Sequence, residues 1–137
     1  MSDHLTLRFK AGTVERLRRR AKRAGTPPRT LAQRYVREGL RRDEHPLVFF
    51  VDGPSGRRAA LVGTGLDVWE VIATVRDNEN DLDEAAAYLT IPSGLVQAAV
   101  TYYGEYRDEV DAEIELNEAE WERGYAAWQA GKHALSS

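Results

Sequence analysis

Cysteine is absent from the sequence, which excludes disulfide frameworks, thiolate zinc sites and cysteine nucleophiles together. No apolar run approaches the roughly 18 residues that a membrane-spanning helix needs, and the N-terminal residues lack the apolar core of a signal peptide. We therefore expect a cytoplasmic protein that makes no membrane contact. The three histidines, His4, His45 and His133, are far apart and show no metal-ligand spacing, so we predict surface residues and neither metal nor cofactor.

Basic residues are scarce in most of the chain but crowded at its start. Residues 1–44 contain 13 lysines and arginines against 5 acidic residues, whereas residues 45–137 contain 6 basic residues against 17 acidic ones. The net charge of -3 conceals this separation. The pattern predicts a basic module for a polyanion, joined to an acidic module with a different partner.

The basic segment begins with a strict alternation of apolar and polar residues at 5–9. On a strand, one face would carry the apolar side chains of Leu5, Leu7 and Phe9. The other face would carry the polar side chains of His4, Thr6, Arg8 and Lys10. The alternation therefore predicts a short strand with one buried face.

Two short helices are predicted to follow this strand. Apolar residues at helical spacing follow Thr13, and Gly25 provides a natural C-terminal stop. Thr26 is then expected to cap a second helix, with Pro27 at its first position and an end near Arg42. About forty residues with a single strand cannot bury enough surface to be stable alone. We therefore predict a homodimer, or a higher even-numbered assembly, with strands paired antiparallel and helices interlocked.

Residues 4 to about 44 resemble the ribbon-helix-helix family of bacterial repressors and antitoxins, in the alternating strand, the turn Gly25-Thr26-Pro27-Pro28 and the overall spacing. The resemblance implies a two-stranded ribbon in the major groove of an operator, where the outward residues read bases. These residues are His4, Thr6, Arg8 and Lys10. It also implies a phosphate clamped by backbone N–H groups at the start of the second helix. The two prolines lack an N–H, which leaves Thr26, Arg29 and Thr30 as donors. The arginines of the first helix either add phosphate contacts or form a solvated face.

His45-Pro46 marks a predicted boundary, beyond which a second globular unit begins. Apolar or extended runs at 47–51 and 57–62, separated by a turn at 52–56, predict a β-hairpin. A helix around residues 66–75 follows, and then two helices over residues 82–103 joined by a turn. This pair has the form of a helix-turn-helix, but residues 77–106 contain 6 acidic residues and no lysine or arginine, so phosphate would repel it. We interpret the pair as a packing or protein-binding element.

Residues 52–114 resemble a small helical domain found in antitoxins encoded beside PIN-like ribonuclease toxins. The likeness lies in the runs at 52–54, 68–72, 85–89 and 96–103. The resemblance implies that this part of the chain binds a toxin.

The acidic tail, residues 111–137, is predicted to be helical with one apolar stripe. The stripe consists of Ile114, Trp121, Tyr125 and Trp128, at intervals of seven, four and three. These aromatics either pack on the chain's own helical domain or anchor the tail in a groove of a toxin, where Arg123 and Lys132 could reach carboxylates of a nuclease site. The acidic character of the tail favours the second hypothesis, since it suits a basic, RNA-cleaving partner.

These patterns predict a mainly α fold with a little β. A ribbon-helix-helix at 1–45 would form an intertwined dimer, followed by a small helical domain with a hairpin at 46–110 and a helical tail at 111–137. We expect an antitoxin of a type II toxin-antitoxin system, which binds double-stranded operator DNA, represses transcription and neutralises a ribonuclease toxin. The alternative is a stand-alone transcription regulator with a ligand-sensing C-terminal domain. An enzyme is not expected, because no paired nucleophile and base, metal cluster or phosphate-binding loop is visible.

Overall fold

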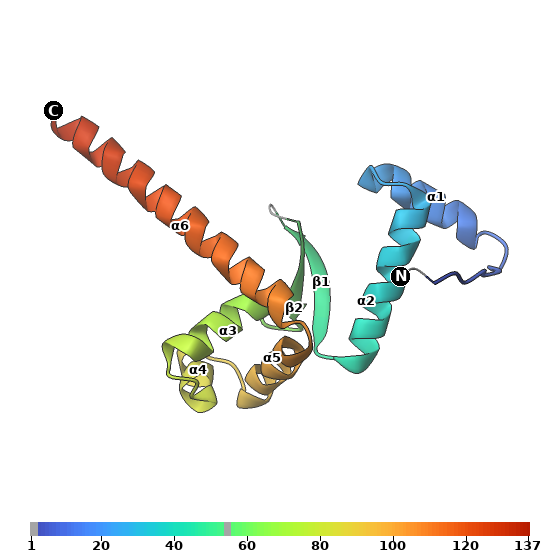
Figure 1. The fold of residues 1–137 in the computed structure, drawn as a ribbon, viewed down its shortest axis with the longest axis horizontal. Helices are drawn as coiled ribbons and strands as arrows, with labels where there is room; N and C mark the ends of the chain where they lie inside the picture. Colours follow the sequence, from blue (N-terminus) through green and yellow to red (C-terminus); the bar gives the residue numbers. More distant parts are fainter. Residues whose placement is uncertain (1–2, 54–55) are drawn as a thin grey trace. The chain divides into compact units, whose positions relative to one another are not determined.

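The computed structural model of the chain describes residues 3–53 and 56–137 and divides into two compact units, Met1–Asp43 (unit 1) and Glu44–Ser137 (unit 2). Within the described residues, the chain forms six helices and one antiparallel hairpin (Figure 1). The prediction of a mainly α fold with a little β is confirmed. None of the helices in this part of the chain combines the length and the apolarity that crossing a membrane requires.

The first helix, α1 (Thr13–Ala24), has the predicted bounds. It ends because Gly25 adopts a left-handed conformation, with φ of 66°, that costs glycine little. The N–H of Thr26 then donates to the carbonyl of Ala21 at 3.1 Å, which closes the last turn in a Schellman-type arrangement.

The second helix, α2 (Pro28–Glu44), begins one residue later and ends two residues later than predicted. The N–H of Leu31 donates to the carbonyl of Pro27 at 3.1 Å, so Pro27 is the N-cap and Pro28 is the first helical residue. The assignment of Thr26 as the N-cap is therefore wrong. Its backbone belongs to the end of α1.

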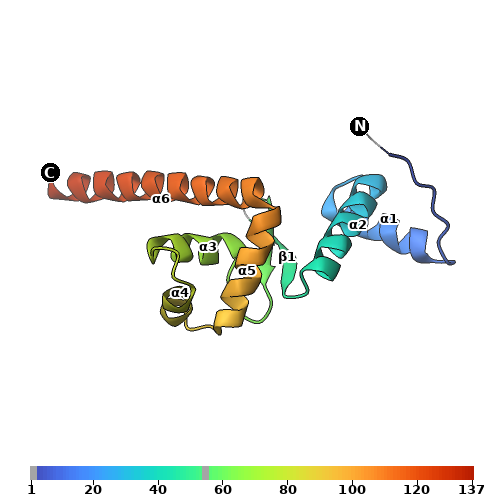
Figure 2. The ribbon, with the colours of Figure 1, turned by 60° about the horizontal axis from the view of Figure 1, so that its bottom comes forward.

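The strand predicted at residues 5–9 is not formed within the single chain. Residues 3–10 have no regular structure and lead as an extended segment into α1 (Figure 2). The physical reason is that a strand exists only as part of a hydrogen-bonded pair, and the described chain offers this segment no partner strand.

Unit 2 opens with the predicted hairpin, formed by β1 (Val48–Gly53) and β2 (Gly56–Leu61). The pairing runs from Val48 opposite Leu61 to Gly53 opposite Gly56. The predicted turn at 52–56 includes Pro54 and Ser55, which lie outside the described residues. The hairpin is confirmed, and its inner side supplies Val48, Ala59 and Leu61 to the core.

Three helices build the core of unit 2 with the hairpin. They are α3 (Val68–Asp77), α4 (Leu82–Leu89) and α5 (Ser93–Glu105). Helix α3 packs against β2, α5 packs against β1, and α4 packs on α3 and α5. Asp67 and Glu70 form a capping box at the start of α3, and Asp81 caps α4 by accepting two backbone N–H groups. The buried side chains include Val68, Val71, Ile72, Val75, Ala85, Val96, Ala99 and Tyr102. The helix pair α4 and α5 thus packs into this core.

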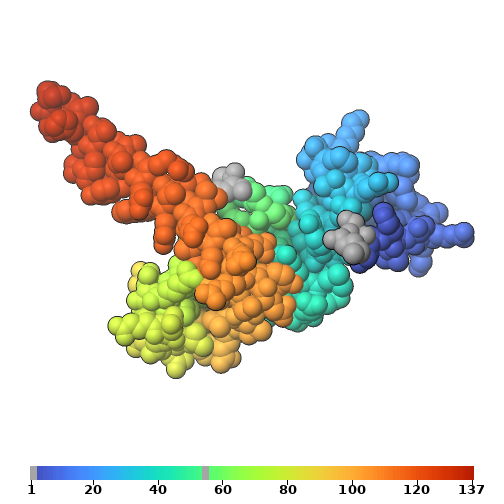
Figure 3. Space-filling view, in the orientation of Figure 1, coloured from blue at the N-terminus to red at the C-terminus, as the bar shows by residue number. Residues whose placement is uncertain are grey.

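The last helix, α6 (Arg107–Ser136), has two different halves. Val110 and Ile114 in its first half are buried in the core of unit 2. From Glu120 onward every residue is exposed. Figure 3 shows this second half, orange to red, projecting away from the rest of unit 2.

Candidate nucleic-acid interface and partner surface

Unit 1 leaves most of its apolar side chains exposed. Among its described residues only Ala21 and Leu31 are buried. Leu7 and Phe9 in the N-terminal segment remain 52% and 49% exposed. Further exposed apolar side chains are Leu5, Tyr35, Val36 and Leu40. An apolar surface of this kind is a candidate interface, because a small unit gains stability by covering such a surface.

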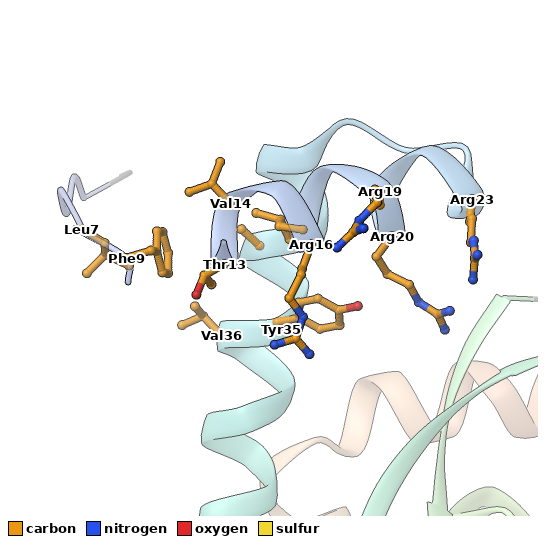
Figure 4. Close-up of a pocket in the computed structure, with 12 residues that line it drawn as sticks. Leu7, Phe9, Thr13, Val14, Arg16, Arg19, Arg20, Arg23, Tyr35 and Val36 are labelled. Atoms are coloured by element: carbon orange, nitrogen blue, oxygen red, sulfur yellow. The ribbon is translucent and has the colours of Figure 1, made fainter. Parts of the chain in front are cut away.

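The exposed side chains surround a hollow within unit 1. It has a volume of about 740 Å³ and is lined by Leu7 and Phe9 from the N-terminal segment, by residues of α1, and by Tyr35 and Val36 of α2. Figure 4 shows these apolar side chains together with Arg16, Arg19, Arg20 and Arg23 of α1, which also line it. The lining of the hollow therefore combines apolar side chains with four positively charged ones.

The residues predicted to read bases lie on the extended segment. His4, Thr6, Arg8 and Lys10 are all exposed. In α1, one positive charge is already paired, since Arg18 Nη1 lies 3.0 Å from Glu15 Oε1. The segment therefore carries polar and basic side chains that are accessible to a polyanion.

The predicted phosphate clamp at the start of α2 loses one of its donors. The backbone N–H of Thr26 is occupied by the carbonyl of Ala21. Pro27 and Pro28 have no N–H, so the N–H groups of Arg29 and Thr30 are those that the first turn of α2 can present. Arg29 also brings an exposed guanidinium to the same turn.

A second exposed surface lies on the far half of α6. We call it the aromatic ridge and define it as Trp121, Tyr125, Trp128 and Lys132. The rings of Trp121 and Tyr125 stack with centroids 5.2 Å apart and planes 7° from parallel. Tyr125 and Trp128 are 6.1 Å apart, and Lys132 Nζ lies 4.4 Å from the ring centroid of Trp128. The four side chains form one continuous row, as the 3.6-residue helical repeat requires.

The ridge lies outside the core of unit 2. Trp121, Tyr125 and Trp128 are 68%, 47% and 57% exposed, whereas Ile114, earlier in the same stripe, is buried. The acidic residues of α6 all precede Arg123, so they border only the start of the ridge at Trp121, and its other end carries the positive charge of Lys132. The argument that an acidic tail favours a basic partner therefore applies to α6 up to Glu122 and not to the part of the ridge beyond it.

An ionic cluster that the sequence did not reveal joins the hairpin, α3 and α6. Arg58 Nε lies 2.8 Å from Asp67 Oδ2, as an ion pair whose N–H is not aligned for a hydrogen bond. Trp69 Nε1 donates to the same oxygen at 3.0 Å. Burial, reinforced by the charges of Glu109 and Asp67, raises the pKa of Glu113 in α6 to about 7. Glu113 is thus a partly buried acid whose ionisation is opposed by its surroundings, and its Oε2 makes no hydrogen bond with the described residues.

A second cluster fixes the first half of α6 from another side. Arg76 of α3 and the hydroxyl of Tyr103 both donate to Asp111 Oδ1, the tyrosine at 2.8 Å. The hydrogen bond from Tyr103 and then that from Arg76 lower the pKa of Asp111. The contact with Asp111 in turn raises the pKa of Arg76. Residues of α3, α5 and α6 meet here, although they lie far apart in the sequence.

His45 is not the surface residue that its isolation in the sequence predicted. It is buried because its ring packs edge-on against Tyr102 and Tyr106, with centroids 5.2 Å and 6.1 Å away. Its Nε2 lies 3.3 Å from Glu105 Oε2. His4 and His133 are exposed, as predicted.

Comparison of the chain with protein-family models, with curated proteins and with solved structures found no match.

Proposed function

We propose that this protein is a homodimeric DNA-binding antitoxin, which grips operator DNA through unit 1 and a ribonuclease toxin through the aromatic ridge. The observation that supports the proposal most is the exposed apolar surface of unit 1. That surface surrounds a hollow of about 740 Å³ and is bordered by arginines.

A second copy of the chain is the partner that best covers this surface. When two N-terminal segments pair as antiparallel strands, each gains the hydrogen bonds that the single chain lacks. Leu5, Leu7 and Phe9 then turn toward the helices of both copies. Their burial would contribute about 1.5 to 3 kcal/mol per side chain.

The same pairing orients the polar side chains outward. Because strand side chains alternate between faces, burial of Leu7 forces Thr6 and Arg8 onto the opposite face of the ribbon. A two-stranded ribbon fits the major groove, where arginine can donate two hydrogen bonds to one guanine. The N–H groups of Arg29 and Thr30 would contact phosphate at the flanks of the ribbon.

The aromatic ridge is suited to a partner protein. Aromatic side chains that stand exposed on a rigid helix are the typical anchors of a helix-in-groove interface. The pre-stacked pair of Trp121 and Tyr125 would lose little side-chain entropy on docking. A toxin that offers an apolar groove with acidic groups near its ends, facing Arg123 and Lys132, fits this surface.

Three measurements on the full chain test the proposal. Sedimentation should give a dimer. Binding to double-stranded DNA should weaken steeply with salt, since each neutralised phosphate releases counterions. Co-purification with the product of an adjacent gene, lost on Trp121→Ala together with Trp128→Ala, would support the toxin. A folded monomer that binds no DNA would contradict the proposal.

A further inference from the structure

The corner where α5 meets α6 carries a group of potential ligand atoms separate from both surfaces above. Glu44, His45 and Glu105 each offer one such atom, and these atoms lie within 4.8 Å of one another. Glu44 and His45 are consecutive, and Glu105 is the last residue of α5. One ring nitrogen and two carboxylates therefore meet at one place.

His45 is held rigidly at this corner. Its carbonyl accepts the N–H of Val48 at 3.0 Å, which fixes the backbone, and its side chain is only 5% exposed. The rings of Tyr102 and Tyr106, themselves 4.7 Å apart, pack against its imidazole. The imidazole therefore cannot swing out to find a partner in water.

The nitrogen Nε2 of His45 is the atom that needs a ligand. It is buried and makes no hydrogen bond with the described residues, although Glu105 Oε2 lies 3.3 Å away. In the tautomer that leaves Nε2 without a proton, its lone pair faces this carboxylate, and in a buried place that arrangement is unfavourable unless a cation lies between the two atoms. Zinc bonds of about 2.0 Å to nitrogen and about 2.0 to 2.2 Å to oxygen, in tetrahedral geometry, put the two ligand atoms about 3.3 Å apart. The observed separation matches one edge of a tetrahedral metal site.

We propose that His45, Glu105 and Glu44 bind a divalent transition-metal ion, with zinc as the best match. Imidazole together with carboxylate is a donor set for first-row transition ions, whereas magnesium and calcium prefer oxygen ligands alone. Glu44 and Glu105 are exposed, so the ion can enter from solvent and keep water in its remaining position. The ion supplies the partner that Nε2 lacks. It also links the residues at the start of unit 2 to the corner between α5 and α6.

The experiment uses the full chain, freed of metal by a chelating resin. Zinc is titrated in competition with a chromophoric chelator, and the imidazole signals are followed by nitrogen-15 NMR. We expect one ion per chain and a shift of one of the three histidine spectra, that of His45. Glu105→Gln should weaken zinc binding at least tenfold. Its matched control is Asp108→Asn, an exposed acid at the same corner that should bind zinc as the unmodified chain does.

Magnesium should not compete at a hundredfold excess. The proposal is overturned if zinc binds with no more than millimolar affinity, or if the shifted signals belong to the exposed His4 or His133. It is also overturned if Glu105→Gln and Asp108→Asn bind zinc equally well, which would mean that a proton satisfies Nε2. Because no arm of the experiment uses DNA or a toxin, its outcome is independent of the proposed antitoxin function.

Discussion

The two units of this chain bury their apolar residues in opposite ways. Unit 2 closes a core around Val48, Leu61, Val96 and Tyr102, with the hairpin on one side and four helices around it. Among its described residues, unit 1 buries only Ala21 and Leu31, half-buries Val14 and Leu17, and exposes its other large apolar side chains. The difference teaches that well-formed helices can enclose a core of their own, as in unit 2, or leave their apolar faces uncovered, as in unit 1. What decides is whether the elements can cover one another's apolar faces.

The largest predicted effect is that of Leu7→Asp, which should abolish folding of unit 1 and leave unit 2 intact. A charge on the face that two copies would bury opposes dimerisation, and the isolated unit is too small to fold. Far-UV circular dichroism should lose the helical signal of α1 and α2. All three tryptophans lie in unit 2, so tryptophan fluorescence should be unchanged.

The matched control is Thr6→Ala on the same segment, which should keep the dimer. A monomeric Leu7→Asp protein with its full helical content would contradict the proposed role of this surface.

Within unit 2, Leu61→Ala should cost about 2 to 5 kcal/mol of unfolding free energy, because a fully buried leucine leaves a cavity. Urea unfolding followed by tryptophan fluorescence measures this loss. Val62→Ala, the next residue and 44% exposed, is the control and should cost much less. Equal losses would mean that the core is not where the structure places it.

On DNA, Arg8→Ala should reduce discrimination between operator and random sequence by about 1 to 3 kcal/mol, the value of a bidentate guanine contact. Arg29→Ala should weaken binding to both sequences alike, because phosphate contacts carry no sequence information. Titrations of both variants on both DNAs separate the two roles. If Arg8→Ala reduces binding to the two DNAs equally, the segment does not read bases.

The stability of unit 2 should fall as pH rises from about 5 to 8. The folded-state pKa of Glu113, about 7, lies above the ordinary value of 4.5, so the folded state binds more protons in this range. The stabilisation of unit 2 that protonated Glu113 provides is complete below the unfolded-state pKa of about 4.5, and it is lost as pH rises through 7. Allowing for half-burial, the change is on the order of 1 to 2 kcal/mol.

Glu113→Gln should remove this pH dependence and make unit 2 more stable than the unmodified chain at pH 8. Asp111 has a lowered pKa, so its titration changes the stability only below about pH 4 and not between pH 5 and 8. Urea midpoints measured at several pH values test the prediction, and an unchanged slope in Glu113→Gln would refute it.

The smallest effect on stability should come from removing residues 120–137. Because every side chain in this range is exposed, the melting temperature of unit 2 should change by no more than a few degrees. The truncated protein should still bind DNA and should lose its toxin partner. A large drop in melting temperature would contradict this prediction and would mean that the ridge packs in the core of unit 2.

Local patterns in the sequence were enough to predict most of the elements. Gly25 ends α1 because its left-handed φ is a property of that residue, and Asp81 caps α4 through its own side chain. The apolar or extended runs on either side of the turn signal at residues 52–56 predicted the hairpin for the same local reason. The N-cap of α2 was misassigned because threonine is a common N-cap residue. In the structure the N–H of Thr26 instead donates to Ala21 at the end of α1.

Only the tertiary structure decided which side chains lose their contact with water. His45 is buried against Tyr102 and Tyr106, and Glu113 is half-buried where it feels the charges of Asp67 and Arg58, residues far from it in the chain. Spacing alone could not tell whether Trp121 and Trp128 pack inside or project outward, since both arrangements need the same helical stripe. The sequence by itself determined the helices, the hairpin and the separation of charge, because these depend on neighbours along the chain. Burial depends on neighbours in space, and so do the ionisation of Glu113 and the gathering of Glu44, His45 and Glu105.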